Sequence, residues 1–287
     1  MLVTARSPTF LISAYDISAA SSSEKARIQE LLGRAFEAGA VGLMDSGNYE
    51  SYWHRNSNWT TDTLATILPQ TQIPLAFCFD QQNPPTTADA IAAEVVSAVL
   101  RDQALAAHTT VLPIVHAPTA LLPTVVFNVV RHLHPLMIAV PERELGEGML
   151  ARAETLTRIR LALESLGHYT PLHLLGTGNP HSILLYALCG ADSFDGLEWC
   201  QTVADPTTAH LHHFQQREML DDSAVARFTS GMNYSLGTLV HNLSFFQEWM
   251  KRVRNAVHSG SGARELEVSF SAEFLKKLRH RMPQLRA

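Results

Sequence analysis

The stretch Pro171–Cys200 (PLHLLGTGNPHSILLYALCGADSFDGLEWC) decides the expected fold. An apolar run at His173–Leu175 is followed by a glycine-rich turn, an apolar helical segment and a second apolar run at Ser193–Leu197 that carries Asp195. Two strands joined by a helix lie parallel in one sheet. In a barrel built from such units, the C-terminal ends of the strands carry the chemistry, which makes Asp195 the first candidate site residue.

The same alternation of short apolar runs and helical patterns extends along the chain. A possible capping box at Ser21 and Glu24 opens one amphipathic segment, which Gly39 ends. The other expected helices are Ala88–Leu105, Met149–Leu166 and Leu239–His258, and the expected strands are Phe10–Ala14, Val41–Met44, Leu75–Phe79, Val111–Val115, Leu136–Val140, His173–Leu175 and Ser193–Leu197. Alternating strands and helices predict an α/β protein with a parallel sheet.

We expect a (β/α)8 barrel of the TIM type with an atypical or missing first strand, because a closed barrel needs an eighth strand. That strand could be Leu2–Ala5, could come from His210–Phe214, or could be absent. The spacing is even and no linker interrupts it, so residues 1–287 are expected to form a single domain.

Composition narrows the class of protein further. Of the 287 residues, 46% are hydrophobic and 17% are charged, which favours a large core over disorder. Three cysteines, an odd number in apolar stretches, indicate reduced buried thiols in a cytoplasmic protein. No apolar run reaches the length of a membrane span.

The net charge of −5 argues against a protein whose whole surface is positively charged for binding nucleic acid. The basic segment Phe274–Ala287 is then either a solvated helix end or a local contact for phosphates.

Polar residues follow four of the expected strands. Asp45, Asp80 and Asp195 come after apolar runs, and His116 ends LPIVH. Any one aspartate could simply cap the next helix. As a group on one face of a barrel, these residues are typical of enzymes that react at a sugar carbon. One carboxylate attacks that carbon as a nucleophile, and another acts as a general acid or base. A further carboxylate could accept hydrogen bonds from the N–H groups of a purine that is flipped out of its stack.

With these residues in view, the chain resembles the tRNA-guanine transglycosylase family from about Phe10 to His258. Asp45-Ser46-Gly47-Asn48 resembles the family's DSGG motif. The segment FCFD, which ends at Asp80, resembles the segment that carries the family's base-binding aspartate. The segment SFD, which ends at Asp195 and is preceded by GTGNP, resembles the family's nucleophile motif. The segment from Ile138 through Ala139 to Val140, followed by PERELGEG, resembles the stretch whose backbone amides contact the base. His116 stands in IVHA where the family has glutamine.

The resemblance implies a glycosyltransferase of the pentosyltransferase class that exchanges guanine in a nucleic acid for a 7-deazaguanine. It makes Asp195 the nucleophile and Asp45 the general acid/base, and it places Asp80, His116, Ser46 and Ala139 at the base. From the residues themselves, Tyr49 could flank a planar base, and Gly176 and Gly178 could let a phosphate or ribose approach the backbone.

The chain also departs from the family. No cysteine follows Cys200, so the family's zinc motif is missing and His241 alone matches one of its ligands. We therefore expect no metal and no redox or nucleotide cofactor. The family's arginine-containing motif after the nucleophile is replaced by Leu197-Glu198-Trp199-Cys200, which favours a branch of the family that modifies DNA over tRNA.

Two alternatives to base exchange remain open. One is a catalytically weak or inactive subunit that binds a deazapurine or DNA and acts with a protein partner. The other is a hydrolytic N-glycosidase, in which water takes the place of the incoming base.

Overall fold

The computed structural model describes residues 7–56, 58–220, 229 and 231–283. Its contacts group the chain into two compact units, which are described separately below. Unit 1 contains residues 1–144 and 162–171, and unit 2 contains residues 145–161 and 172–287. The single domain expected over residues 1–287 stays a prediction.

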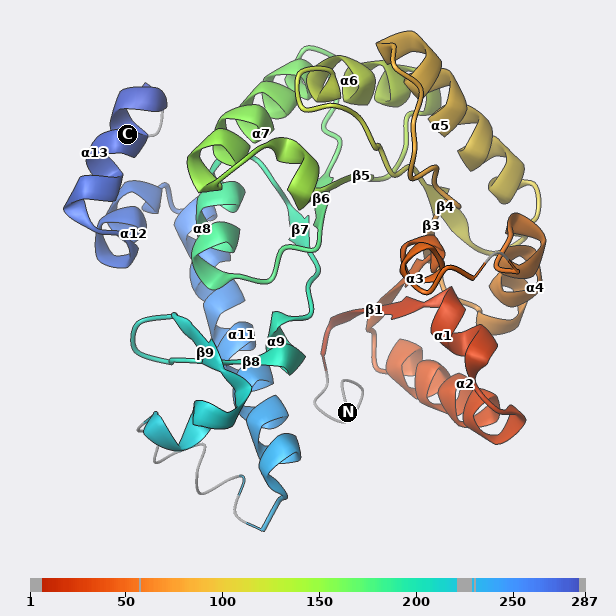
Figure 1. Ribbon diagram of the computed structural model, residues 1–287, viewed down its shortest axis with the longest axis horizontal. Helices are drawn as coiled ribbons and strands as arrows, with labels where there is room; N and C mark the ends of the chain where they lie inside the picture. The colour runs from red at the N-terminus through yellow and green to blue at the C-terminus, as the bar shows by residue number, and fades with distance from the viewer. Residues whose placement is uncertain (1–6, 57, 221–228, 230, 284–287) are drawn as a thin grey trace. The chain divides into compact units, whose positions relative to one another are not determined.

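Unit 1 is built on a parallel sheet. The order is β1 (Thr9–Ser13), β2 (Val41–Asp45), β3 (Leu75–Phe77) and β4 (Thr110–Leu112), each strand parallel to the next (Figure 1). Beside β4 lies β5 (Ile138–Pro141), joined to the segment after β4 by a parallel bridge between Ile114 and Ala139. The carboxyl ends of neighbouring parallel strands meet at one edge of the sheet, and this brings the residues after β2, β3 and β4 together.

Helices follow each strand of unit 1. Their bounds are α1 (Ala14–Ala19), α2 (Ser22–Glu37), α3 (Asn48–Trp53), α4 (Thr61–Thr71), α5 (Ala88–Gln103), α6 (Leu122–Leu133) and the 3-10 turn η1 (Glu142–Leu145). The expected capping box is confirmed: the Ser21 hydroxyl accepts from the Glu24 N–H, and the Glu24 carboxylate accepts from the Ser21 N–H. The helices α5 and α6 pack against each other (Figure 1).

Unit 2 begins with α7 (Met149–Glu164), whose last three residues belong to unit 1. Its strands β6 (Leu172–Leu175) and β7 (Ser193–Phe194) pair in parallel, with α8 (Pro180–Leu188) between them. The later elements are α9 (Glu198–Gln201), β8 (Thr202–Ala204), β9 (Leu211–His213), η2 (Phe214–Met219), α11 (Tyr234–His258), α12 (Gly262–Ser269) and α13 (Ala272–Arg281). The helices α8 and α11 pack against each other (Figure 1). Ile183 and Leu184 of α8 belong to the same buried apolar cluster as Trp249 and Val253 of α11.

One buried side chain ties α11 to the hairpin of β8 and β9. The Asn242 amide donates to the carbonyls of Trp199 and Thr202, both at 2.7 Å, and its oxygen accepts from the Ala204 N–H at 3.0 Å. Asn242 has no exposed surface. All of its hydrogen-bonding groups are therefore used inside the protein.

The parallel α/β class expected from the sequence is confirmed, and all seven expected strand segments contain a strand. Of the candidates for an eighth strand, Leu2–Ala5 lies outside the described residues. The other candidate, around His210–Phe214, forms β9, which pairs antiparallel with β8 and so is not a parallel strand. Across the described ranges, no helix is both long and apolar enough to cross a membrane.

Candidate functional site

The Asp45–Asn48 turn closes the end of β2. Gly47 has φ +77°, a conformation that glycine adopts without strain, and its N–H donates to Asp45 Oδ2 at 2.9 Å. A Cβ on Gly47 would lie 2.6 Å from the backbone nitrogen of Tyr15, so the position has no room for a side chain. The turn thus directs Ser46 into the protein, where only 1% of it is exposed.

The carboxylate of Asp80 lies next to Ser46. The Ser46 hydroxyl donates to Asp80 Oδ1 at 3.2 Å, and the side-chain amide of Asn48 donates to the Asp80 carbonyl at 2.7 Å. The segment before Asp80 is fixed by α5, because the buried carboxylate of Asp102 accepts from the Phe79 N–H at 2.6 Å. These bonds hold Asp80 at the end of β3 with 7% of its surface exposed.

His116 lies between two carboxylates. Its Nε2 is 2.8 Å from Asp80 Oδ2 and its Nδ1 is 2.6 Å from Glu144 Oε1. Burial alone would lower the pKa of His116, but the bonds to Asp80 and Glu144 outweigh it and raise the pKa to about 9. His116 is therefore an imidazolium at neutral pH, with both N–H groups donating. The other Glu144 oxygen accepts from the Ala117 N–H at 2.9 Å, which fixes the carboxylate.

Two further side chains extend this network toward the surface. The Gln82 amide donates to Asp80 Oδ2, and the Gln82 oxygen accepts from Arg143 at 3.0 Å. The Arg143 guanidinium lies over the ring of Tyr49, 5.0 Å from its centroid, and Tyr49 is 44% exposed. The Tyr49 ring thus lies at the exposed edge of this hydrogen-bond network, with the Arg143 guanidinium against one of its faces.

Asp195 in unit 2 is held through one oxygen. Its Oδ1 accepts from the Gly176 N–H at 3.1 Å and lies 3.1 Å from Nε2 of His173. Nδ1 of His173 is 2.9 Å from the Ser193 hydroxyl. A hydroxyl that donates to Nδ1 leaves the proton on Nε2, which then donates to Asp195. Among the described residues, both hydrogen bonds to the carboxylate fall on Oδ1, so Oδ2 is the oxygen left for a substrate.

The glycine-rich turn before α8 is shaped by its sequence. The Asn179 side chain caps α8 by accepting from the N–H groups of its first turn, and Pro180 follows at the first helical position. Gly176 has φ +75° with open space where a Cβ would stand, whereas the Glu198 carboxylate fills that space at Gly178. Protein atoms thus leave space beside Gly176, whereas Glu198 is the close neighbour of Gly178, and the approach of a phosphate or ribose to these glycines stays a prediction.

The structure brings Asp45, Ser46, Asp80, His116 and Tyr49 together at one edge of unit 1. Ala139 is placed differently, because its N–H donates to the Pro113 carbonyl and its carbonyl accepts from the Val115 N–H, both at 2.9 Å. Those backbone groups are engaged in strand pairing.

Several side chains that bond to the candidate residues could not be predicted from the sequence. Glu144, Gln82 and Arg143 come from turns with no distinctive spacing. His173 had a detectable signal, since it is a lone polar residue inside the apolar run LHLL and only 2% of it is exposed.

The residues around His241 do not match a structural zinc site. Its Nε2 donates to the Ala204 carbonyl at 2.7 Å. No group of three or more histidine, cysteine, aspartate or glutamate side chains within the described part of the chain is arranged to hold a metal ion. A structural zinc site of the expected family needs four such donors.

No family model matches the chain, and no curated protein matches it either. The resemblance to the transglycosylases therefore depends on the short sequence motifs alone.

Proposed function

We propose that the protein is a base-exchange transglycosylase that replaces guanine in a nucleic acid, DNA in preference to tRNA, with a 7-deazaguanine. The (β/α)8 barrel expected from the sequence is part of this proposal. The observation that carries it is the carboxylate of Asp195, which is fixed through Oδ1 by His173 and Gly176 and keeps Oδ2 for reaction.

A carboxylate with one anchored oxygen suits attack on a sugar carbon. Oδ2 of Asp195 bonds to C1′ while the bond from C1′ to N9 of guanine breaks, and the electron pair leaves with the base, whose N9 takes a proton from Asp45 in its predicted role as general acid. N9 of the incoming 7-deazaguanine then attacks C1′, the bond from C1′ to Oδ2 breaks, and the carboxylate is restored. The N9 proton of the incoming base passes to a general base, the role predicted for Asp45.

The network in unit 1 supports recognition of a polar, planar ligand. Asp80 accepts hydrogen bonds from Ser46, Gln82 and His116, so its orientation is set before any ligand arrives. The base-binding roles of Asp80 and His116 stay predictions.

A trapping experiment tests the proposal. The full chain is incubated with guanine-containing DNA and, separately, with tRNA, and a denaturing gel detects a covalent protein–nucleic acid adduct. Asp195→Ala removes the nucleophile. Asp62→Ala serves as the matched control, because Asp62 is an exposed aspartate on α4 that makes none of the contacts described above.

We expect an adduct with DNA that Asp62→Ala keeps and Asp195→Ala loses. Release of labelled guanine that depends on an added 7-deazaguanine would indicate exchange, and release without it would indicate hydrolysis. No adduct and no guanine release with either polymer would contradict the proposal.

A further inference from the structure

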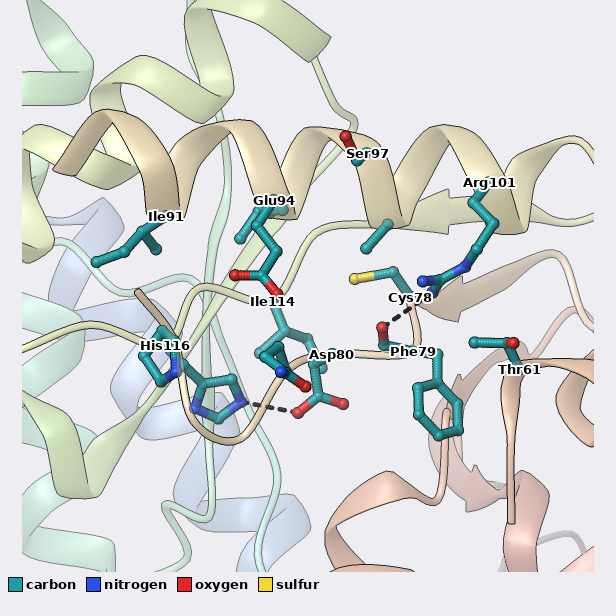
Figure 2. Close-up of a pocket in the computed structure, with 14 residues that line it drawn as sticks. Thr61, Cys78, Phe79, Asp80, Ile91, Glu94, Ser97, Arg101, Ile114 and His116 are labelled. Atoms are coloured by element: carbon teal, nitrogen blue, oxygen red, sulfur yellow. Dashed lines mark hydrogen bonds and ion pairs between the residues drawn. The ribbon is translucent and has the colours of Figure 1, made fainter. Parts of the chain in front are cut away.

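Unit 1 contains a cavity of about 430 Å³ between α5 and the segment that follows β3 (Figure 2). One wall is apolar and consists of Ile91, Val95 and Ala98 from α5 with Cys78 and Ile114 from the strand ends. Each of these residues is at most 9% exposed. Pockets for small molecules commonly combine such a wall with a few polar groups.

Two of the charged groups that line the cavity already have partners within the protein. His116 is bonded to Asp80 and Glu144, and Arg101 is bonded to Asp102 and to the Phe79 carbonyl.

Glu94 differs from these groups. Its side chain extends from α5 into the cavity (Figure 2). Among the described residues, its carboxylate has no hydrogen-bond or ion-pair partner. Glu94 is thus the charged group of the cavity that a ligand can engage without breaking a bond inside the protein.

We propose that this cavity binds a small aromatic amine. The ring would lie on the apolar wall of α5, and the ammonium group would bond to Glu94. A charge-assisted hydrogen bond of this kind is stronger than a neutral one, and the two cations of the cavity, His116 and Arg101, are already paired with carboxylates of the protein. The cavity shares Asp80 and His116 with the predicted base-binding residues, but the binding measurement does not require the proposed reaction.

Tryptamine is a suitable probe, because it joins a planar ring to an ammonium group and fits within the cavity volume. Its matched control is tryptophol, which has the same ring with a neutral hydroxyl in place of the ammonium. Calorimetry on the full chain measures both. We expect tryptamine to bind at least about tenfold more tightly than tryptophol, as the bond to a charged partner implies.

Two variants locate the site. Glu94→Gln should bring tryptamine down to the affinity of tryptophol, while Glu30→Gln, which changes an exposed glutamate on α2, should leave the difference intact. Ser97→Trp, at an exposed position on the rim, should weaken both ligands by filling the cavity. Equal binding of the two ligands to the unaltered protein, no binding of tryptamine, or an unchanged preference in Glu94→Gln would overturn the inference.

Discussion

The protonated His116 makes a defined contribution to stability that depends on pH. Its pKa of about 9 in the folded chain exceeds the ordinary value of 6.5 because Asp80 and Glu144 favour the charged form over the opposing effect of burial. For a group whose pKa is raised by folding, the added stability is fully present below the unfolded pKa and is lost as the pH rises through the folded pKa. Stability should therefore fall between about pH 6.5 and about pH 9.

The size of the effect follows from the two pKa values. A rise from 6.5 to about 9, at about 1.4 kcal/mol per pH unit, corresponds to about 3 kcal/mol. Solvent screening is weak, because the side chain of His116 is 6% exposed and that of Asp80 is 5% exposed. The free energy of unfolding, measured in urea at about pH 6.5 and about pH 10, gives the loss directly.

The variant His116→Gln isolates this contribution, because glutamine keeps a hydrogen-bond donor but does not titrate. Other groups titrate in the same range, so the quantity to compare is the unaltered protein minus the variant at each pH. That difference should shrink by about 3 kcal/mol as the pH rises. Glu144→Gln should move the change to lower pH by removing one of the two carboxylates. A parallel loss in the unaltered protein and in His116→Gln would refute the reasoning.

Three further predictions concern positions that orient the site. His173→Phe should lower the turnover number of the proposed base exchange by about 100-fold with little change in KM, because Asp195 loses its orienting donor, and steady-state kinetics checks this. Gly47→Ala should destabilise the chain by at least about 2 kcal/mol in urea unfolding, because the left-handed backbone and the lack of room act together. Asp102→Ala should cost about 2 kcal/mol by leaving the Phe79 N–H unpaired. Asp102→Asn should recover part of that loss, and equal unfolding midpoints for the two variants would contradict this explanation.

The sequence predicts the order of the elements well, because each strand is a short apolar run between polar turns. It predicts the first and last residues of these elements less accurately. The expected strand Leu75–Phe79 stops at Phe77, since the Phe79 N–H bonds to the side chain of Asp102 instead of a neighbouring strand. The expected helix Leu239–His258 begins earlier, at Tyr234, because Asn233 caps it by accepting from the Leu236 N–H.

The residues of the candidate site likewise include some that could be predicted from the sequence and some that could not. Asp80 and His116 could be found because they end apolar runs, and parallel strands place such ends side by side. Glu144 could not be found, because it stands in a 3-10 turn 28 positions after His116. Its role depends on how the chain folds back, which no local pattern specifies.

The buried amide of Asn242 has a consequence for how unit 2 opens. It bonds to Trp199 of α9 and to Thr202 and Ala204 of β8 at once, so α9 and β8 cannot both separate from α11 without exposing three backbone groups together. Local opening events in proteins involve cooperative segments of this kind. In hydrogen–deuterium exchange, the amides of β8 and those of the middle of α11 should therefore exchange at one shared rate, as a single foldon.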